Sequence, residues 1–338
     1  MQLAAAIGGL GAMAAVHADT KVTENTTVGA KMFADLTNLN AESAGVKTAA
    51  SGTGIDVPRF YLVVNHTFDD NWSANLTTDF QYTSSTGATQ LYIKKAYIQY
   101  KVSDAFWARI GSADLAWVPF VEDTYTYRYY EKVIIDRTGF GTSADWGVHI
   151  GGKLSNGMVN YAVGLIEGNG YKNPTRSKSM DIDARVSFVP VKGFTAALGL
   201  YNGKRGKDVE GATTFHTATR YSGLLAYATD KFRVGGEYFT ADNWNNVTTT
   251  ASDSANGYSV FGSVALNSRW SVLARYDNEK PSKDLAPNRK EDYYNIGFAV
   301  KPRKGIDLNL GFKHDEVKNN GVTASKFDEV GIWAQMSY

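Results

Sequence analysis

The chain has 338 residues, no cysteine and a formal net charge of +1. The lack of cysteine excludes a disulfide scaffold and any thiolate metal site. A net charge near zero without a basic block argues against a nucleic-acid-binding protein. The mean hydropathy of -0.29 excludes a bundle of membrane-spanning helices. The length suits either two ordinary domains or one large all-β domain.

The one long apolar stretch covers residues 1–18. It is rich in Ala and Gly and ends in Val16-His17-Ala18, the small-x-small pattern that precedes signal-peptidase cleavage. It lacks a positively charged beginning, which we attribute to a native start upstream. We predict a signal peptide over residues 1–18, with export from the cytoplasm, and a single domain over residues 19–338. A buried helix is the alternative.

After Ala18 the apolar residues recur with a period of two. In residues 27–36 every second side chain is apolar, and the intervening positions include Lys31 and Asp35. Successive side chains of a strand point to opposite faces, so this pattern predicts a strand with one apolar and one polar face. Residues 59–68 and 72–82 repeat it.

The pattern predicts about sixteen strands of roughly ten residues, the length that crosses a bilayer as a tilted strand. The predicted spans are 26–37, 58–68, 72–83, 90–102, 105–113, 144–154, 158–167, 180–189, 194–203, 215–228, 232–242, 257–266, 270–279, 291–301, 306–316 and 327–338.

Short and long connections alternate between these strands. The short ones, such as 69–71 and 190–193, contain the turn formers Asp, Asn, Gly and Pro. The long ones are 38–57, 84–89, 114–143, 168–179, 204–214, 243–256, 280–290 and 317–326. This asymmetry between the two ends is typical of an outer-membrane barrel.

A large apolar residue begins the strand after each short turn, at intervals of about one hairpin. The series is Trp72, Phe106, Met158, Phe194, Phe232, Trp270 and Ile306. The interval from Phe106 to Met158 is much longer, because it contains the insertion 114–143. The chain ends in an alternating stretch, 330–338, that closes on an aromatic residue and resembles the C-terminal signature of outer-membrane barrels.

The polar face decides between a soluble β-sandwich and a membrane barrel. It carries too many charges to be a packed interior, whereas a closed barrel of about sixteen strands encloses an aqueous channel. Closure also satisfies every backbone group in lipid. We therefore predict an all-β fold, a transmembrane antiparallel β-barrel whose long third loop folds inward.

No catalytic, metal or cofactor site is predicted. The histidines are scattered, and the sequence contains no G-x-S-x-G or Walker motif. Asp181 and Asp183 share a strand face, but Arg185 follows on the same face, which favours a solvated ladder of charges over acid–base catalysis. A barrel hydrolase is therefore not favoured.

Charged positions on the polar face are the candidate pore-lining residues. The strands contribute Arg59, Lys95, Arg109 and Arg185, and the insertion contributes Glu122, Asp123, Tyr127, Arg128, Lys132 and Arg137. A ring of fixed charge selects ions, although cross-strand pairing of opposite charges is an alternative reading. Basic residues slightly outnumber acidic ones on this face, so we predict weak anion preference and a zwitterionic constriction.

Two further expectations follow from alternation. Lys94 points outward, between Tyr92 and Ala96. Glycines on the polar face, such as Gly199 and Gly311, indicate open space in the lumen, which favours an open channel over a plugged one.

Four segments, 93–111, 128–132, 136–154 and 161–170, resemble the phosphate-selective porin O/P family. The resemblance implies a sixteen-stranded barrel, usually trimeric, with a constricting third external loop. Phosphate-specific members carry a dense Arg and Lys ladder, whereas here acidic residues are interleaved with the basic ones.

We therefore predict a porin for small hydrophilic solutes with weak preference for anions, phosphate among them. The expected location is the outer membrane of a Gram-negative bacterium. The expected partners are lipid, lipopolysaccharide and two further copies of the chain, but no nucleic acid. A sugar-permeable porin and a non-conducting structural or adhesive barrel are the alternatives.

Overall fold

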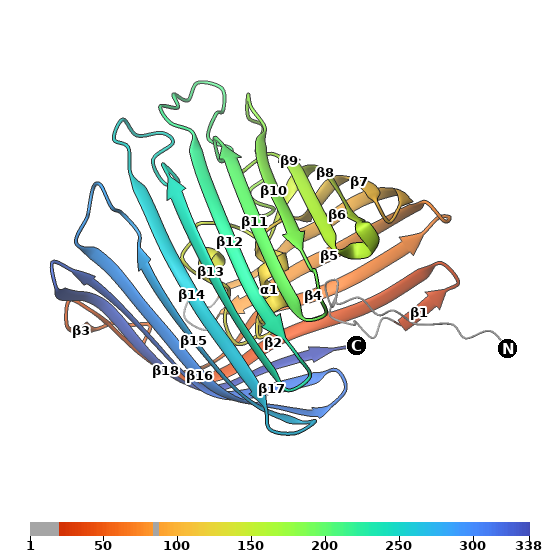
Figure 1. Cartoon of the computed structure of the whole chain (residues 1–338). Helices are drawn as coiled ribbons and strands as arrows, with labels where there is room; N and C mark the ends of the chain where they lie inside the picture. Colours follow the sequence, from red (N-terminus) through yellow and green to blue (C-terminus); the bar gives the residue numbers. More distant parts are fainter. Residues whose placement is uncertain (1–19, 84–87) are drawn as a thin grey trace.

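The structure is a computed structural model that describes residues 20–83 and 88–338. The predicted signal peptide lies outside the described residues, as do residues 84–87 of the predicted connection 84–89. The described residues form one antiparallel sheet of 18 strands (Figure 1). The short strands β1 (Thr20–Thr23) and β3 (Val46–Lys47) pair with β2 (Thr26–Ser43), and the remaining 16 strands close a barrel.

The other strands follow one another around the barrel in chain order. They are β4 (Gly52–Thr67), β5 (Trp72–Thr83), β6 (Ala88–Ser103), β7 (Phe106–Asp114), β8 (Ala144–Leu154), β9 (Val159–Ile166), β10 (Asp181–Phe188), β11 (Phe194–Gly203), β12 (Ala218–Ala228), β13 (Phe232–Asp242), β14 (Ser254–Ala265), β15 (Trp270–Lys280), β16 (Arg289–Arg303), β17 (Ile306–Asn319) and β18 (Val322–Ser337). Pairing of β18 with β2 closes the ring, which removes exposed sheet edges.

The sequence prediction of the strands is confirmed, except at two ends. The predicted loops 38–57 and 317–326 are mostly strand, since β2 pairs with β4 as far as Leu39 and Gly52, and β17 pairs with β18 as far as Asn319 and Val322. These ends are mostly polar, with isolated apolar residues such as Leu39 and Ile55, so apolar alternation does not reveal them. The Asn-Gly pair at 320–321 is the sequence feature that indicates a hairpin between β17 and β18, because both residues adopt the positive φ of a two-residue hairpin turn.

The two faces of the barrel are those that the alternation predicts. Large apolar side chains such as Leu198 and Ile110 point outward and are 67% and 64% exposed. Charged side chains such as Asp183, Glu237 and Arg275 point inward and are buried. An apolar outer surface and a polar interior are expected of a transmembrane barrel.

Residues 115–143, which we name the inner loop, connect β7 to β8 and contain two short helices. Helix α1 (Val118–Tyr125) begins with a proline in its first turn, where the missing N–H costs nothing. It ends where Thr126 adopts a left-handed conformation. Helix α2 (Ile134–Arg137) is a single turn. Neither helix of the described chain is long and apolar enough to span a membrane.

Figure 1 shows α1 inside the ring of strands, with long loops at one end of the barrel and short turns at the other. Apolar side chains of the inner loop pack on inward-facing side chains of the strands. Trp117, Val121 and Ile134 share a buried cluster with Phe239 and Phe261. A second buried cluster joins Tyr129 and Tyr130 of the inner loop to inward-facing side chains that include Phe33, Tyr61 and Trp333. The core of this protein is therefore the contact between the inner loop and the barrel wall.

Candidate functional site in the barrel lumen

Two aromatic side chains attach the inner loop to the barrel wall. Each of them lies against a glycine of a strand. The indole Nε1–H of Trp117 donates to Oε1 of Glu237 at 2.7 Å. The hydroxyl of Tyr130 lies 2.9 Å and 2.8 Å from the carbonyl oxygens of Ile296 and Phe312.

The glycines make room for these rings. A Cβ at Gly199 would lie 2.3 Å from the Trp117 ring, and a Cβ at Gly311 would lie 2.5 Å from the Tyr130 hydroxyl. The interpretation of these inward glycines as open space is therefore wrong. They accommodate the side chains of the inner loop.

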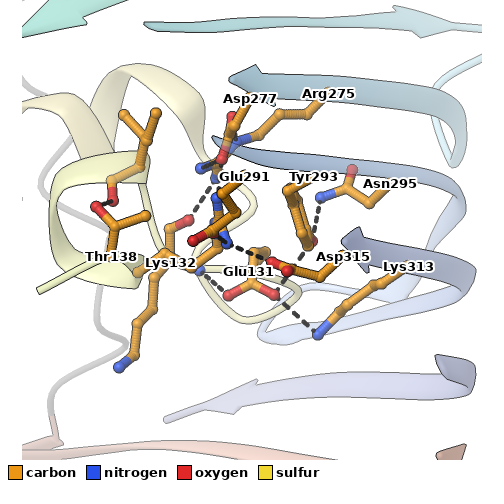
Figure 2. A network of polar contacts seen from close by, with 12 residues as sticks. Glu131, Lys132, Thr138, Arg275, Asp277, Glu291, Tyr293, Asn295, Lys313 and Asp315 are labelled. Carbon is orange, nitrogen blue, oxygen red and sulfur yellow. Dashed lines mark hydrogen bonds and ion pairs between the residues drawn. The ribbon is translucent and has the colours of Figure 1, made fainter. Parts of the chain in front are cut away.

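A network of ions holds the second half of the inner loop (Figure 2). Arg137 binds three carboxylates, at 3.1 Å to Asp277, 2.6 Å to Glu291 and 2.8 Å to Asp315. Its side chain is only 11% exposed. Arg137 therefore joins the inner loop to β15, β16 and β17.

Glu131 makes the complementary contacts in the same network. It accepts from the Tyr293 hydroxyl at 3.1 Å and pairs with Lys313 at 3.2 Å. Burial opposes ionisation of Glu131, but Lys313, Arg137 and Arg275 outweigh it and lower the pKa to about 2. The Glu131 carboxylate is therefore charged throughout the physiological range.

The first half of the inner loop and its end are held on neighbouring strands. The Ala116 N–H donates to Asp183 at 2.6 Å, and Asp183 pairs with Arg220 at 3.4 Å. Arg220 also donates to the carbonyl of Phe140. These polar attachments of the inner loop thus fall on β10 to β17.

The other side of the inner loop faces β2 to β6, where basic side chains gather. The Nε of Arg59 on β4 lies 3.7 Å from Asp79. On the inner loop, Arg128 pairs with Glu122 and lies 3.6 Å from Asp136. Lys31 on β2 lies within electrostatic reach of Glu122 and Arg128. This face between the inner loop and β2 to β6 is the candidate constriction.

Lys94 belongs to this face, contrary to the sequence prediction. A register irregularity between β5 and β6 follows the pairing of Thr77 with Lys95. The Nζ of Lys94 lies 3.5 Å from the inward-facing Tyr61 hydroxyl and 4.7 Å from its ring centroid. A bulge adds one residue to a strand and so interrupts the alternation of faces. Both Lys94 and Lys95 therefore reach the lumen.

The carboxylates of the candidate constriction are largely paired, and several cations are not. Lys95 pairs with Asp114, in addition to the Arg59 and Arg128 pairs. Within residues 20–83 and 88–338, no carboxylate oxygen lies within 4.0 Å of the Nζ of Lys31, Lys94 or Lys172. The unpaired charge of this region is therefore mainly positive.

Lys172 comes from the connection between β9 and β10. Its Nζ lies 3.0 Å from Oε1 of Gln81 and 4.7 Å from the ring centroid of Tyr92. Burial and, next, the nearby Arg59 lower the pKa of Lys172 to about 8. This lysine is therefore mostly cationic at neutral pH.

Asp123 and, on β2, Asp35 are the carboxylates of this region without an ion pair among the described residues. Asp123 lies on α1, its side chain is exposed to the lumen, and none of the described cations pairs with it within 4.0 Å. Enclosure by the barrel and, next, the carboxylates of Asp114 and Glu122 raise the pKa of Asp123 to about 7. Its charge therefore changes near neutral pH.

The predicted site residues divide into three groups. Arg59, Lys95, Glu122, Asp123 and Arg128 gather at the candidate constriction.

Arg109 and Arg185 lie further toward the short turns, where Arg109 packs on Trp107 and Arg185 packs on Phe120. Arg137 is an anchor. The carbonyl of Lys132 accepts a hydrogen bond from Arg275, and Tyr127 packs against both buried clusters.

The sequence analysis places Lys31 on the polar face of a predicted strand but does not select it for the constriction. It directs Lys94 outward and does not include Lys172. The direction of Lys94 depends on the bulge, and the direction of Lys172 depends on the path of a long connection. The alternation of apolar residues in the sequence reports neither of them.

A family model for the phosphate-selective porins O and P matches residues 27–223, more than half of the chain. The chain belongs to this family. It is an outer-membrane porin, a channel-forming β-barrel of the Gram-negative outer membrane. The resemblance seen in the sequence is thereby confirmed, whereas no curated protein matches the chain.

Solved structures share the fold of this porin at low sequence identity. The anion-selective porin from Comamonas acidovorans has 13% identity and a TM-score of 0.67, covering 93% of this chain and 99% of that one. The outer-membrane channel DcaP of Acinetobacter baumannii has 14% identity and a TM-score of 0.67, covering 94% and 99%. The trimer form of OmpT of Vibrio cholerae has 10% identity and a TM-score of 0.63, covering 93% and 99%.

Proposed function

We propose that this porin is a passive diffusion channel for small hydrophilic solutes with a weak preference for anions, including phosphate. Solutes pass between the inner loop and the wall formed by β2 to β6. The fixed charge on this path acts on every permeating ion, because a charge within a few Å of the path is only partly screened by water.

The observation that carries the proposal is the excess of unpaired cations at the candidate constriction. Lys31, Lys94 and Lys172 have no ion pair among the described residues, whereas the carboxylates of Asp79, Asp114 and Glu122 are paired. Asp123 and Asp35 offset only part of this charge. The acidic partners also explain why we propose a weak preference and not a dedicated phosphate site.

Reconstitution of the refolded protein into a planar bilayer tests conduction. We expect discrete channel steps in KCl. Heat-modifiable gel mobility shows that the barrel is folded. A folded protein that gives no channel steps would support the non-conducting alternative. Titration with a neutral sugar tests the sugar-permeable alternative, since a sugar site would block the current in a saturable way.

We propose a homotrimer embedded in lipid and lipopolysaccharide as the assembled form. The support is the usual assembly that the family resemblance implies and the trimer form in which OmpT of Vibrio cholerae is known. Chemical cross-linking of the protein in native outer membranes tests this proposal, with a band at three times the monomer mass as the expected result.

A further inference from the structure

A cavity of about 220 Å³ lies between α1 and the end of the barrel that carries short turns. Its lining combines aromatic and basic side chains: Trp107, Phe120, Tyr161, Lys153, Arg185 and Arg233. Asp123 is the one carboxylate among its described lining residues. This composition differs from that of the candidate constriction, where carboxylates alternate with cations.

Two arginines from different strands supply hydrogen-bond donors to the cavity. Arg185 donates through Nε to the Ala116 carbonyl at 2.8 Å and through Nη1 to Ser187 at 2.6 Å. Arg233 donates through Nη1 to the Thr126 hydroxyl. Among the described residues neither arginine has a carboxylate within 4.0 Å. Each guanidinium carries five N–H groups, so both retain donors for an incoming anion.

The aromatic side chains of the cavity are held in place. The guanidinium of Arg185 stacks on Phe120, with 4.0 Å from Cζ to the ring centroid. Trp107 occupies the space beside Gly151, where a Cβ would lie 2.4 Å from the indole. The Tyr161 hydroxyl donates to the Ala105 carbonyl at 2.9 Å. Fixed rings lose little conformational entropy when a flat molecule packs against them.

We propose that this cavity is a binding subsite for small aromatic anions, in which Arg185 and Arg233 bind the carboxylate and Trp107, Phe120 and Tyr161 contact the ring. The assignment rests on the proposed channel function, because the cavity lies in the lumen below the constriction. Charge-assisted bonds from two guanidinium groups favour an anionic group, and ring–ring packing favours a flat apolar body. An aliphatic anion of the same charge satisfies only the first requirement.

Calorimetric titration of the detergent-folded protein with benzoate and with acetate tests the subsite without requiring conduction. We expect benzoate to bind at least about tenfold more tightly than acetate, since the ring adds apolar contact. Arg185→Gln and Arg233→Gln each lower benzoate affinity about tenfold. Trp107→Leu lowers the affinity for benzoate and leaves that for acetate unchanged.

Lys231→Gln is the matched control, because Lys231 is an exposed cation in a neighbouring short turn and does not line the cavity. Heat-modifiable gel mobility establishes that each variant is folded. The three cavity variants change different residues, so a folding defect in one of them leaves the other two as tests. Equal affinity for benzoate and acetate, or benzoate affinity that no cavity variant changes, would overturn the subsite. Channel steps in KCl are measured in a separate experiment. A protein that conducts but shows no preference for benzoate contradicts the proposed subsite and leaves the proposed channel intact. Benzoate binding without conduction contradicts the channel.

Discussion

At the scale of single residues, the charge of the lumen depends on side chains whose direction is set by local backbone geometry. The register irregularity between β5 and β6 places Lys94 beside Tyr61 on the inner face. In a regular strand this lysine would face lipid, where a charge is costly. One irregularity in the ladder thus adds a cation to the channel.

Replacing Lys94 by Gln should lower the anion-to-cation permeability ratio about two- to fivefold. The physical reason is the loss of one unit charge close to the ion path, worth about 0.5–1 kcal/mol in water-like surroundings. Lys101→Gln on the same strand is the control, because Lys101 lies near the short turns and pairs with Asp104 at 2.7 Å. Reversal potentials that are the same for both variants would contradict the inward direction of Lys94.

We expect Asp123 to make the ion preference of the channel depend on pH. The pKa of Asp123 is raised to about 7 and that of Lys172 is lowered to about 8. As the pH falls from 8 to 6, Asp123 loses negative charge and Lys172 gains positive charge, so both changes favour anions. We expect the reversal potential to move toward that of chloride over this range. In Asp123→Asn the shift should be smaller, with stronger anion preference already at pH 8, and an unchanged shift would contradict the role of Asp123.

At the scale of elements, the inner loop is a bound part of the wall. Trp117 and Tyr130 occupy the space that Gly199 and Gly311 leave, and Arg137 joins three strands through their carboxylates. Loss of one partner from a buried ion network costs about 3–5 kcal/mol. The loop therefore has a fixed position relative to β10 to β17, and in the proposed channel this position sets the width of the path toward β2 to β6.

Gly199→Ala should displace Trp117, because the new Cβ would lie 2.3 Å from its ring. Overpacking of this kind costs about 1–3 kcal/mol, and we expect a lower temperature for loss of the folded gel band together with noisier channel currents. Gly223→Ala on the neighbouring strand is the matched control, since a Cβ there meets nothing within 4 Å. Equal behaviour of the two variants would show that Trp117 does not require the glycine.

The strands and their faces were predictable from sequence, and the contacts of the inner loop were not. Alternation reports which side chains point inward, as for Arg59 and Arg185. It does not report which strand a loop residue meets, because the partners of Arg137 are 140 to 178 residues away in the chain. Alternation also fails where a bulge interrupts it, as at Lys94.

At the scale of the whole molecule, a near-neutral chain still produces a lumen with a directional charge. The chain has 35 basic and 34 acidic side chains, but inside the barrel their pairing is unequal. Acidic groups are used to anchor the inner loop or to pair with arginines, as Asp277 and Glu122 illustrate. In the proposed channel the remaining cations face the solute path, so we expect selectivity to arise from the arrangement of charges and not from the net charge.

The reversal potential of the wild-type channel in a KCl gradient at pH 7 tests this account most directly. Unpaired cations at the constriction predict a modest preference for chloride, on the order of a few-fold in permeability, that weakens at high ionic strength as screening increases. A reversal potential whose sign indicates a preference for potassium over chloride would contradict this account.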